Sequence, residues 1–479
     1  MATLKEKTAS GLLWGAINNG LMQLLNIVFG IFLARILSPA DYGLVGMIAI
    51  FTAVASALQE SGFTSALVNK KDVTDADYNS VFWFSSAMSS ILFVLLFFLA
   101  PYIADYYRQP QLVALSRVAF ICIPVSVLGL VPQAYLFKYL KVKEATYIRI
   151  FALIVSGITG ITLAFNGKAY WSLVWQQLTY VSITSLGKYA LIPWRPSLHI
   201  DFGPARHMFG FSCKIMLTSI ITTINQNILT VIFGKLFQPK VVGNFTQAYK
   251  WSNMTSSLVS GTIAQVAQPV FAEINDDEIR QTHVVRKMMR FTAFLAFPVM
   301  FGLAIIAKEF ILITISEKWI GCVTLLQILC ISGAFLPLQQ TYQNLIISHN
   351  RSDIYLGINI AQVVLQIMVV LVLGSYGIHT MVIGYTLFNI LWLMAWHHYT
   401  HRLIPLKLTD TLKDILPFML AAAFTMAVAY LSTLAIDNLP LRMLAKIGIA
   451  AGVYFVLMKV AHAKILDECL SYLFHKKQS

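Results

Sequence analysis

Long runs of apolar residues alternate with short polar connections along the whole chain. Fourteen of these runs come close to or exceed the length of about 20 residues that a helix needs to cross a bilayer, and longer runs can tilt. We therefore predict fourteen spans, at 10–36, 40–67, 79–103, 112–136, 146–165, 169–193, 208–234, 241–270, 289–315, 319–346, 354–374, 378–400, 413–435 and 441–463. Pro124, Pro132 and Pro298 lie inside spans and are expected to kink them. The predicted fold class is an all-α polytopic membrane protein.

An internal repeat divides the chain. A shift of 200 residues aligns RILSPADYG at 35–43 with KLFQPKVVG at 235–243, each with a basic start, a proline and a final glycine. The two motifs occupy matching places in two six-helix blocks, which predicts a parallel repeat. The domains we expect are an N-terminal six-helix lobe at 1–195, a C-terminal six-helix lobe at 205–402, two additional transmembrane helices at 412–465 and a cytoplasmic tail at 466–479.

Composition and charge narrow the class further. Of the 479 residues, 58% are hydrophobic and 12% are charged, and the mean hydropathy is +0.71. A soluble domain carries about twice that charged fraction, so a soluble enzyme, a disordered chain and a nucleic-acid-binding module are excluded. The net charge is +14, and with the N-terminus inside, 20 Lys and Arg residues fall in inside loops and tails against 7 outside. This bias predicts that both termini are cytoplasmic.

Catalytic and metal signatures are absent from the sequence. The five cysteines form no CxxC pair, and no GxxxxGK[ST], HExxH or GxSxG motif occurs. The HHYTH run at 397–401 has no nearby carboxylate, so we interpret it as an interfacial cluster and not as a metal site. The N-terminal segment lacks a cleavage site and is expected to be a retained first helix. We predict no catalytic residue, no metal and no cofactor.

Four charged residues lie inside predicted spans. A charge at the bilayer centre costs about 2.5–3.5 kcal/mol, so it usually faces a cavity or a partner. Lys250 lies near the midplane and cannot easily reach either interface, which favours a role in a cavity. Lys214 and Arg149 lie nearer the cytoplasmic side, where snorkelling is the alternative. Glu60 either forms a structural ion pair or takes part in transport.

Amide side chains concentrate on the first two helices of each half. Those that we expect to bind substrate are Asn19, Gln23, Asn26, Asn225, Asn227 and Gln247. The first three are spaced by four and three residues, so they share one helix face. Hydrogen bonding between helices, at about 0.6 kcal/mol per bond, is the alternative. A basic, amide-rich cavity suits an anionic sugar or phosphate, and the paired bundles favour a transporter over a channel or a structural protein.

Several stretches resemble bacterial polysaccharide exporters of the Wzx type, in the multidrug/oligosaccharidyl-lipid/polysaccharide exporter superfamily. They are TASGLLWGAINNGLMQLLNIVFGIFLARILSPADYGLVGM at 8–47, GFTSALVNKKDVTDADYNSVFW at 62–83, FKYLKVKEATYIRI at 137–150 and GNFTQAYKWSNM at 243–254. The resemblance spans the whole chain in order. It is closest to the subgroup that includes the colanic acid and teichuronic acid exporters.

The resemblance implies a flippase of the bacterial inner membrane that moves an undecaprenyl-pyrophosphate-linked oligosaccharide by alternating access. It implies a cavity lined by spans 1, 2, 7 and 8, which carry Glu60, Lys214 and Lys250, with Glu60 a candidate for coupling to H⁺ or Na⁺. The expected partners are the lipid-linked oligosaccharide, the phospholipid bilayer, a polysaccharide polymerase and glycosyltransferases, with no nucleic acid. A drug/cation antiporter or a lipid II flippase of the same superfamily, or a polytopic glycan polymerase or glycosyltransferase, are the alternatives.

Overall fold

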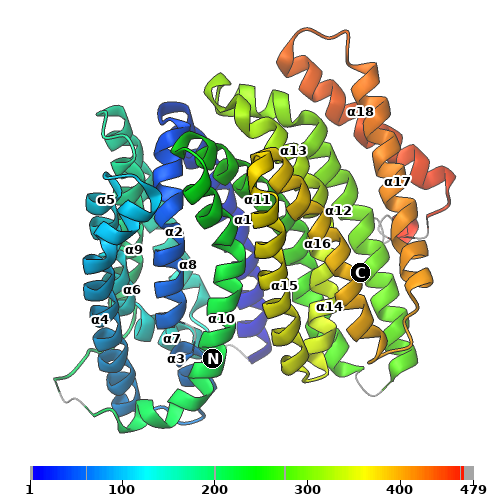
Figure 1. The fold of residues 1–479 in the computed structure, drawn as a ribbon. Helices are drawn as coiled ribbons and strands as arrows, with labels where there is room; N and C mark the ends of the chain where they lie inside the picture. The colour runs from blue at the N-terminus through cyan, green and yellow to red at the C-terminus, as the bar shows by residue number, and fades with distance from the viewer. Residues whose placement is uncertain (1–3, 61, 199–200, 275–276, 464, 469–479) are drawn as a thin grey trace. The chain divides into compact units, whose positions relative to one another are not determined.

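The computed structural model describes residues 4–60, 62–198, 201–274, 277–463 and 465–468. Within these ranges all regular secondary structure is helical, which confirms the predicted fold class (Figure 1). The helices are α1 (Leu4–Ile36), α2 (Pro39–Glu60), α3 (Phe63–Asn69), α4 (Asp75–Tyr107), α5 (Leu112–Ala119), α6 (Cys122–Leu128), α7 (Leu130–Lys138), α8 (Val142–Phe165), α9 (Trp171–Gly187), η1 (Lys188–Leu191), α10 (Gly203–Leu236), α11 (Pro239–Glu273), α12 (Glu278–Thr314), η2 (Glu317–Trp319), α13 (Ile320–Gly333), α14 (Leu336–Ser348), α15 (Ser352–Val372), η3 (Gly374–Tyr376), α16 (Ile378–His401), α17 (Leu408–Ser432) and α18 (Leu439–Val460).

Most of the predicted spans coincide with these helices. In the described part of the chain, 11 segments are long and apolar enough to cross a membrane. They cover every predicted span except the first, the sixth and the eighth. The apolar part of α1 is limited to Gly20–Ile36, α9 has 17 residues, and α11 is long but rich in polar residues. The chain is therefore a multi-pass membrane protein, and the number fourteen stays a prediction.

Prolines break the predicted span at 112–136 into three short helices. Proline lacks an N–H group, and its ring collides with the carbonyl group four residues earlier. The interruption between α5 and α6 lies three to four residues before Pro124, and the one at Gly129 lies three residues before Pro132. The expected distortion is thus found at both positions. Pro298, by contrast, lies inside the uninterrupted α12.

The helices form two compact units, Met1–Gly243 and Asn244–Ser479. In the first unit, α8 packs against α1 and α9, and α10 packs against α2 and α4. In the second unit, α12 packs against α13, α17 and α18, and α15 packs against α16. The two units divide within α11, and the expected lobes at 1–195 and 205–402 stay predictions.

The two repeat motifs both belong to the first unit and meet through their main chains. Pro39 begins α2 and Pro239 begins α11, and Gly43 and Gly243 each follow four residues later. A Cβ atom on Gly43 would overlap the carbonyl oxygen of Pro239, and one on Gly243 would overlap that of Pro39. Because only hydrogen atoms fit on both sides, this reciprocal contact requires glycine at both positions.

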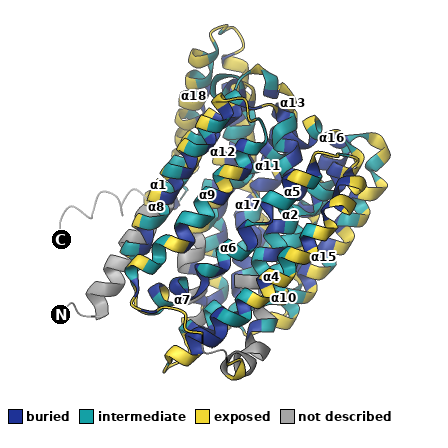
Figure 2. Cartoon of the chain, turned by 90° about the vertical axis from the view of Figure 1, so that its left-hand side faces the viewer, coloured by how far each residue is buried: buried dark blue, intermediate teal, exposed yellow. Residues whose placement is uncertain are grey.

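Exposed apolar side chains lie along the outer helices. On α18, for example, Leu444 and Val456 have exposed fractions of 63% and 57%. Figure 2 shows exposed residues along this helix. A soluble monomer rarely exposes such continuous apolar surface, whereas lipid chains solvate it without penalty, as the hydropathy of the sequence predicts.

A capping box fixes the start of α4 in the stretch NKKDVTDADYN. The side chain of Thr74 accepts a hydrogen bond from the main-chain N–H of Asp77, and Asp77 accepts one from the N–H of Thr74. The carboxylate of Asp77 is 3% exposed and pairs with Lys70 Nζ at 2.7 Å. This end of the first unit is therefore held by both a helix cap and a partly buried ion pair.

Candidate functional site

Lys250 lies on α11 in the second unit. It is roughly 16 Å from the start of the helix at 1.5 Å per residue, close to the middle of a membrane-sized helix. Its neighbours fix the helix in place: the ring of Trp251 is 5.0 Å from that of Phe310 on α12, and Ser252 Oγ donates to Leu329 O on α13 at 3.2 Å. Lys250 itself is half-buried and, within the described residues, forms no hydrogen bond or ion pair. An ammonium group at this depth calls for water or an anionic partner.

A chain of buried polar side chains begins next to Lys250. The side chain of Tyr249 lies beside those of Asn253 on the same helix and Tyr385 on α16. Asn389 Nδ2 donates to the main-chain oxygen of Tyr385 at 2.8 Å, and Asn389 Oδ1 accepts from Gln362 Nε2 on α15 at 2.9 Å. Three helices of the second unit are thereby connected through amides and phenols, a low-dielectric setting in which polar networks gain strength.

Gln247 lies one turn before Lys250 on α11. The side chain is 1% exposed, and neither its amide oxygen nor its amide nitrogen has a hydrogen-bond partner in the described part of the chain. Residues three apart share a helix face, so this unsatisfied amide and the ammonium group of Lys250 lie on one side of α11. Both groups have free hydrogen-bonding capacity for a ligand.

The first unit contains a separate cavity of about 300 Å³ between α2, α6, α9 and α10. Among the predicted site residues, Asn227 lines it, and its Nδ2 donates to Thr223 O at 2.9 Å. The other polar lining residues are Thr52, Ser56, Ser126 and Gln177. Among the described residues no charged side chain lines this cavity, and those that do line it offer amides and hydroxyls.

The remaining predicted site residues are only partly described. Gln23 is half-buried and Asn26 exposed on α1, and Asn225 is half-buried on α10. The side chains of Asn19, Glu60 and Lys214 lie outside the described residues. Within single units the structure therefore brings together Gln247 and Lys250, and it places Asn227 in a cavity with residues that the sequence interpretation did not select.

The sequence interpretation missed a buried ionic cluster in the second unit. Glu309 on α12 is 2% exposed, and its Oε1 lies 2.8 Å from Lys446 Nζ and 3.2 Å from Arg442 Nε on α18. The signal was present, because Glu309 and Lys446 are charges within apolar runs. The pairing itself could not be predicted from the sequence, since the two residues are 137 positions apart.

The histidine run at the end of α16 is used for structural hydrogen bonds. His397 Nδ1 is 3.2 Å from the hydroxyl of Tyr342, and His401 Nδ1 is 2.9 Å from Leu406 O. In the described residues no three His, Cys, Asp or Glu side chains gather in a way that could bind a metal ion. The interpretation of this run as a non-metal cluster stays a prediction.

Known proteins match most of the chain. Residues 32–324, more than half of the length, match the family described as polysaccharide biosynthesis protein. The lipopolysaccharide biosynthesis protein WzxC of Escherichia coli (strain K12) is 24% identical over 397 residues, which cover 81% of this chain and 80% of WzxC. The teichuronic acid biosynthesis protein TuaB of Bacillus subtilis (strain 168) is 24% identical over 359 residues, which cover 74% of each protein.

The fold is also shared with a solved structure. The lipid II flippase MurJ, in an inward closed conformation, superposes with a TM-score of 0.77 at 15% sequence identity, covering 95% of this chain and all of MurJ. At that identity the match concerns the fold alone. The chain belongs to the polysaccharide biosynthesis protein family, and its resemblance to Wzx-type proteins of the multidrug/oligosaccharidyl-lipid/polysaccharide superfamily is confirmed.

Proposed function

We propose that this protein is a transporter and not an enzyme: a flippase that moves an undecaprenyl-pyrophosphate-linked oligosaccharide across the bacterial cytoplasmic membrane by alternating access. The names of WzxC and TuaB support the glycan substrate, and the name of MurJ, with which it shares its fold, supports lipid flipping. The observation that carries the proposal is Lys250, an ammonium group near mid-helix depth with no partner in the described residues, beside a chain of buried amides and phenols.

In this proposal, Lys250 and Lys214 bind the negative pyrophosphate as compact point charges. Amides both donate and accept hydrogen bonds, so they suit sugar hydroxyls. Those assigned to the glycan are Asn19, Gln23, Asn26, Asn225, Asn227 and Gln247. Glu60 is proposed to carry a coupling H⁺ or Na⁺. A negative-inside potential assists the outward movement of a negative headgroup by about 2.3 kcal/mol per charge per 100 mV.

The buried carboxylates argue against a drug/cation antiporter. Such a transporter would need a free carboxylate to bind an organic cation in its spans. The buried carboxylates among the described residues are Asp77, Glu309 and Asp414, and each forms an ion pair with Lys or Arg. Each of these three groups is already neutralised within its own unit, so none of them is available to bind an organic cation.

Deletion of the gene tests the proposed substrate. We expect lipid-linked oligosaccharide to accumulate in the inner leaflet and surface polysaccharide to disappear, and both to recover with a plasmid copy. Glycosyltransferases are expected to build the substrate and a polymerase to consume it. Sensitivity to cationic dyes with normal surface polysaccharide would favour the drug antiporter. A block in peptidoglycan synthesis would favour a lipid II flippase.

The orientation is proposed from the loop charges. Reporter fusions after Lys141 and at the C-terminus should report a cytoplasmic location, and fusions at Arg108 and Lys240 an external one. The positive-inside bias is the physical reason. An external C-terminus would show that the predicted number of spans is wrong by one.

A further inference from the structure

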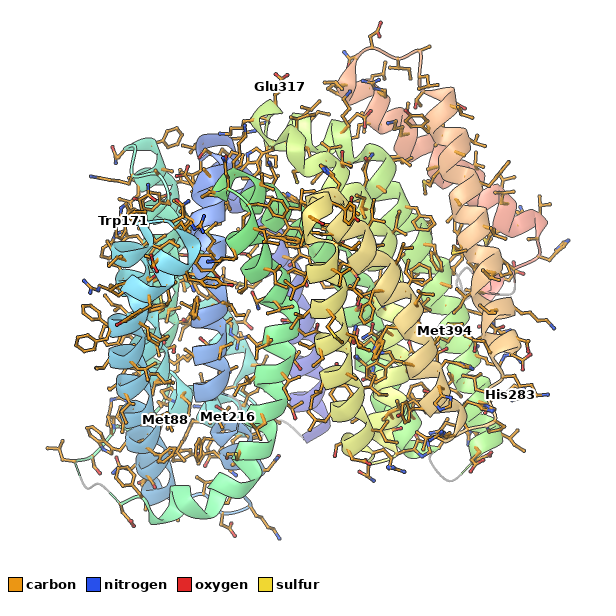
Figure 3. The ribbon with its side chains drawn as sticks, in the orientation of Figure 1. Met88, Trp171, Met216, His283, Glu317 and Met394 are labelled. Atoms are coloured by element: carbon orange, nitrogen blue, oxygen red, sulfur yellow. The ribbon has the colours of Figure 1, made fainter. Side chains whose placement is uncertain are left out.

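A second cavity of the first unit, of about 620 Å³, lies at the end of the unit where α4 begins and α7 ends. Three parts of the chain that are distant in sequence line it: the first turn of α4, the last turns of α7, and the connection after η1, from residues 193–197 and Asp201. Trp171, at the start of α9, lies toward the opposite end of this unit (Figure 3). The volume falls within the range of about 300–1,000 Å³ that is typical of small-molecule sites.

Aromatic rings form much of the wall. The ring of Tyr78 is 6.1 Å from that of Trp194 and 6.0 Å from that of Tyr135, whose own ring is 4.4 Å from Tyr139. Trp194 is buried, whereas Tyr139 is 51% exposed and offers its surface to the cavity mouth. Tyr78 is only 3% exposed, and its hydroxyl has no hydrogen-bond partner within the described residues. A buried hydroxyl with unused capacity in a cavity wall indicates a polar ligand.

Charged and amide groups complete the wall, and several are held in place. Arg195 Nη1 donates to the carbonyl oxygens of Ile192 at 2.7 Å and of Trp194 at 2.8 Å. Ser197 N donates to Asn79 Oδ1 at 2.9 Å. Asp75, also in the lining, is in the first turn of α4, between Thr74 and Asp77 of the capping box. The site is therefore organised before any ligand enters, which lowers the entropy cost of binding.

We propose that this cavity binds a pyranose unit of the glycan before transport, an inference that rests on the proposed function. The C–H faces of a sugar ring are apolar and pack on aromatic faces, here those of Tyr139 and Tyr135. The ring hydroxyls require charged and amide partners, here Asp75, Arg195 and Asn79. The loop charges predict that this end of the unit is cytoplasmic, the side on which a lipid-linked glycan is assembled.

An organic cation is the rival occupant of an aromatic cavity. Two cations already occupy its surroundings. Arg195 belongs to the lining, and Lys141 Nζ lies 5.7 Å from the ring centre of Tyr135. These two cations offset the two lining carboxylates, Asp75 and Asp201. The described lining therefore has no excess of negative charge to attract an organic cation, and its mixture of donors and acceptors suits the hydroxyl groups of a sugar. This is why we assign the site to a sugar.

Binding to the purified full-length protein tests the assignment. Glucose, galactose, mannose and their disaccharides are titrated into the protein, with saturation-transfer NMR as the readout and tetramethylammonium as the rival probe. We expect at least one sugar to bind, and Tyr139→Ala and Asp75→Asn each to bind it about tenfold more weakly. Tyr376→Ala removes a tyrosine of the second unit that is also solvent-exposed, with an exposed fraction of 71% against 51% for Tyr139, and should bind like the wild type.

Three results would overturn the assignment. They are absence of binding by every sugar, unchanged sugar binding by Tyr139→Ala, and binding of tetramethylammonium in place of sugar. Failure here is distinguishable from failure of the proposed function. If deletion of the gene abolishes surface polysaccharide but no sugar binds, only the pocket assignment fails. If deletion leaves surface polysaccharide intact, the flippase proposal fails regardless of what the cavity binds.

Discussion

Replacing Lys446 with alanine should weaken the attachment of α18 to α12. The pair that this lysine forms with Glu309 is 2.8 Å long, with side chains only 5% and 2% exposed. Removing one partner of a buried pair costs about 3–5 kcal/mol, because the other charge stays in apolar surroundings. Arg442, which is 23% exposed, still lies 3.2 Å from the same carboxylate oxygen, so we expect the lower end of that range. For a cooperative unit of this size, that corresponds to a fall in Tm of about 6–12 °C.

Thermal unfolding of the purified protein in detergent, followed by fluorescence, measures this loss. The matched control is Lys459→Ala, which removes an exposed lysine from the same helix and should leave Tm unchanged. The double variant Glu309→Leu with Lys446→Met should be more stable than either single variant, since an apolar pair of similar volume requires no desolvation of charge. A Lys446→Ala protein with the Tm of the wild type would refute the reasoning.

Three further predictions concern charge, pH and close packing. Lys250→Ala should lose most transport at normal expression, and Lys250→Arg should keep part of it. Lys250→Glu should be the least active, because repulsion of the headgroup replaces attraction. Surface polysaccharide and protein level are measured in the same cells, and full transport by a well-expressed Lys250→Glu would contradict the headgroup role. Burial lowers the pKa of His349, whose Nε2 donates to Gln281 at 2.8 Å, so the folded state favours the neutral ring. Stability contributed by this residue is complete above pH 6.5 and is lost as the pH falls below it, and His349→Gln should flatten a plot of Tm against pH in that window. Gly43→Ala should destabilise the protein by about 1–3 kcal/mol or more, since its Cβ meets main-chain atoms, whereas Gly448→Ala, with open space around it, should not lower Tm.

Local sequence signals were sufficient for the all-helical class and for most of the spans, whereas the two six-helix lobes stay a prediction. Membrane-length apolar runs follow from the thickness of the bilayer, and Pro124 and Pro132 break their helix because of covalent chemistry that acts within one turn. The contact between the two motifs was not predicted, because a shared pattern of proline and glycine does not indicate that the two segments touch.

Long-range partners could not be predicted in the same way. The contact of Glu309 with Lys446 and that of Tyr249 with Tyr385 depend on which helix faces meet, and a single apolar run does not encode its rotation about its axis. The proposed sugar cavity combines residues from 75–79, 135–139 and 193–197 with Asp201, and none of these segments carries a recognisable motif alone. Such sites depend on how the helices pack, so sequence patterns indicate which residue types are present but not which of them come together in space.

The reciprocal contact of Gly43 and Gly243 has a consequence for suppressor genetics. Most steric clashes in a protein core can be relieved by a smaller residue at the position that the new side chain contacts. Here the new Cβ atoms would overlap the main-chain carbonyl groups of Pro239 and Pro39, and every amino acid has such a carbonyl group. A selection for regained export after Gly43→Ala should therefore return glycine at position 43, or changes that shift a whole helix, and no second-site replacement at position 239 should restore the fit.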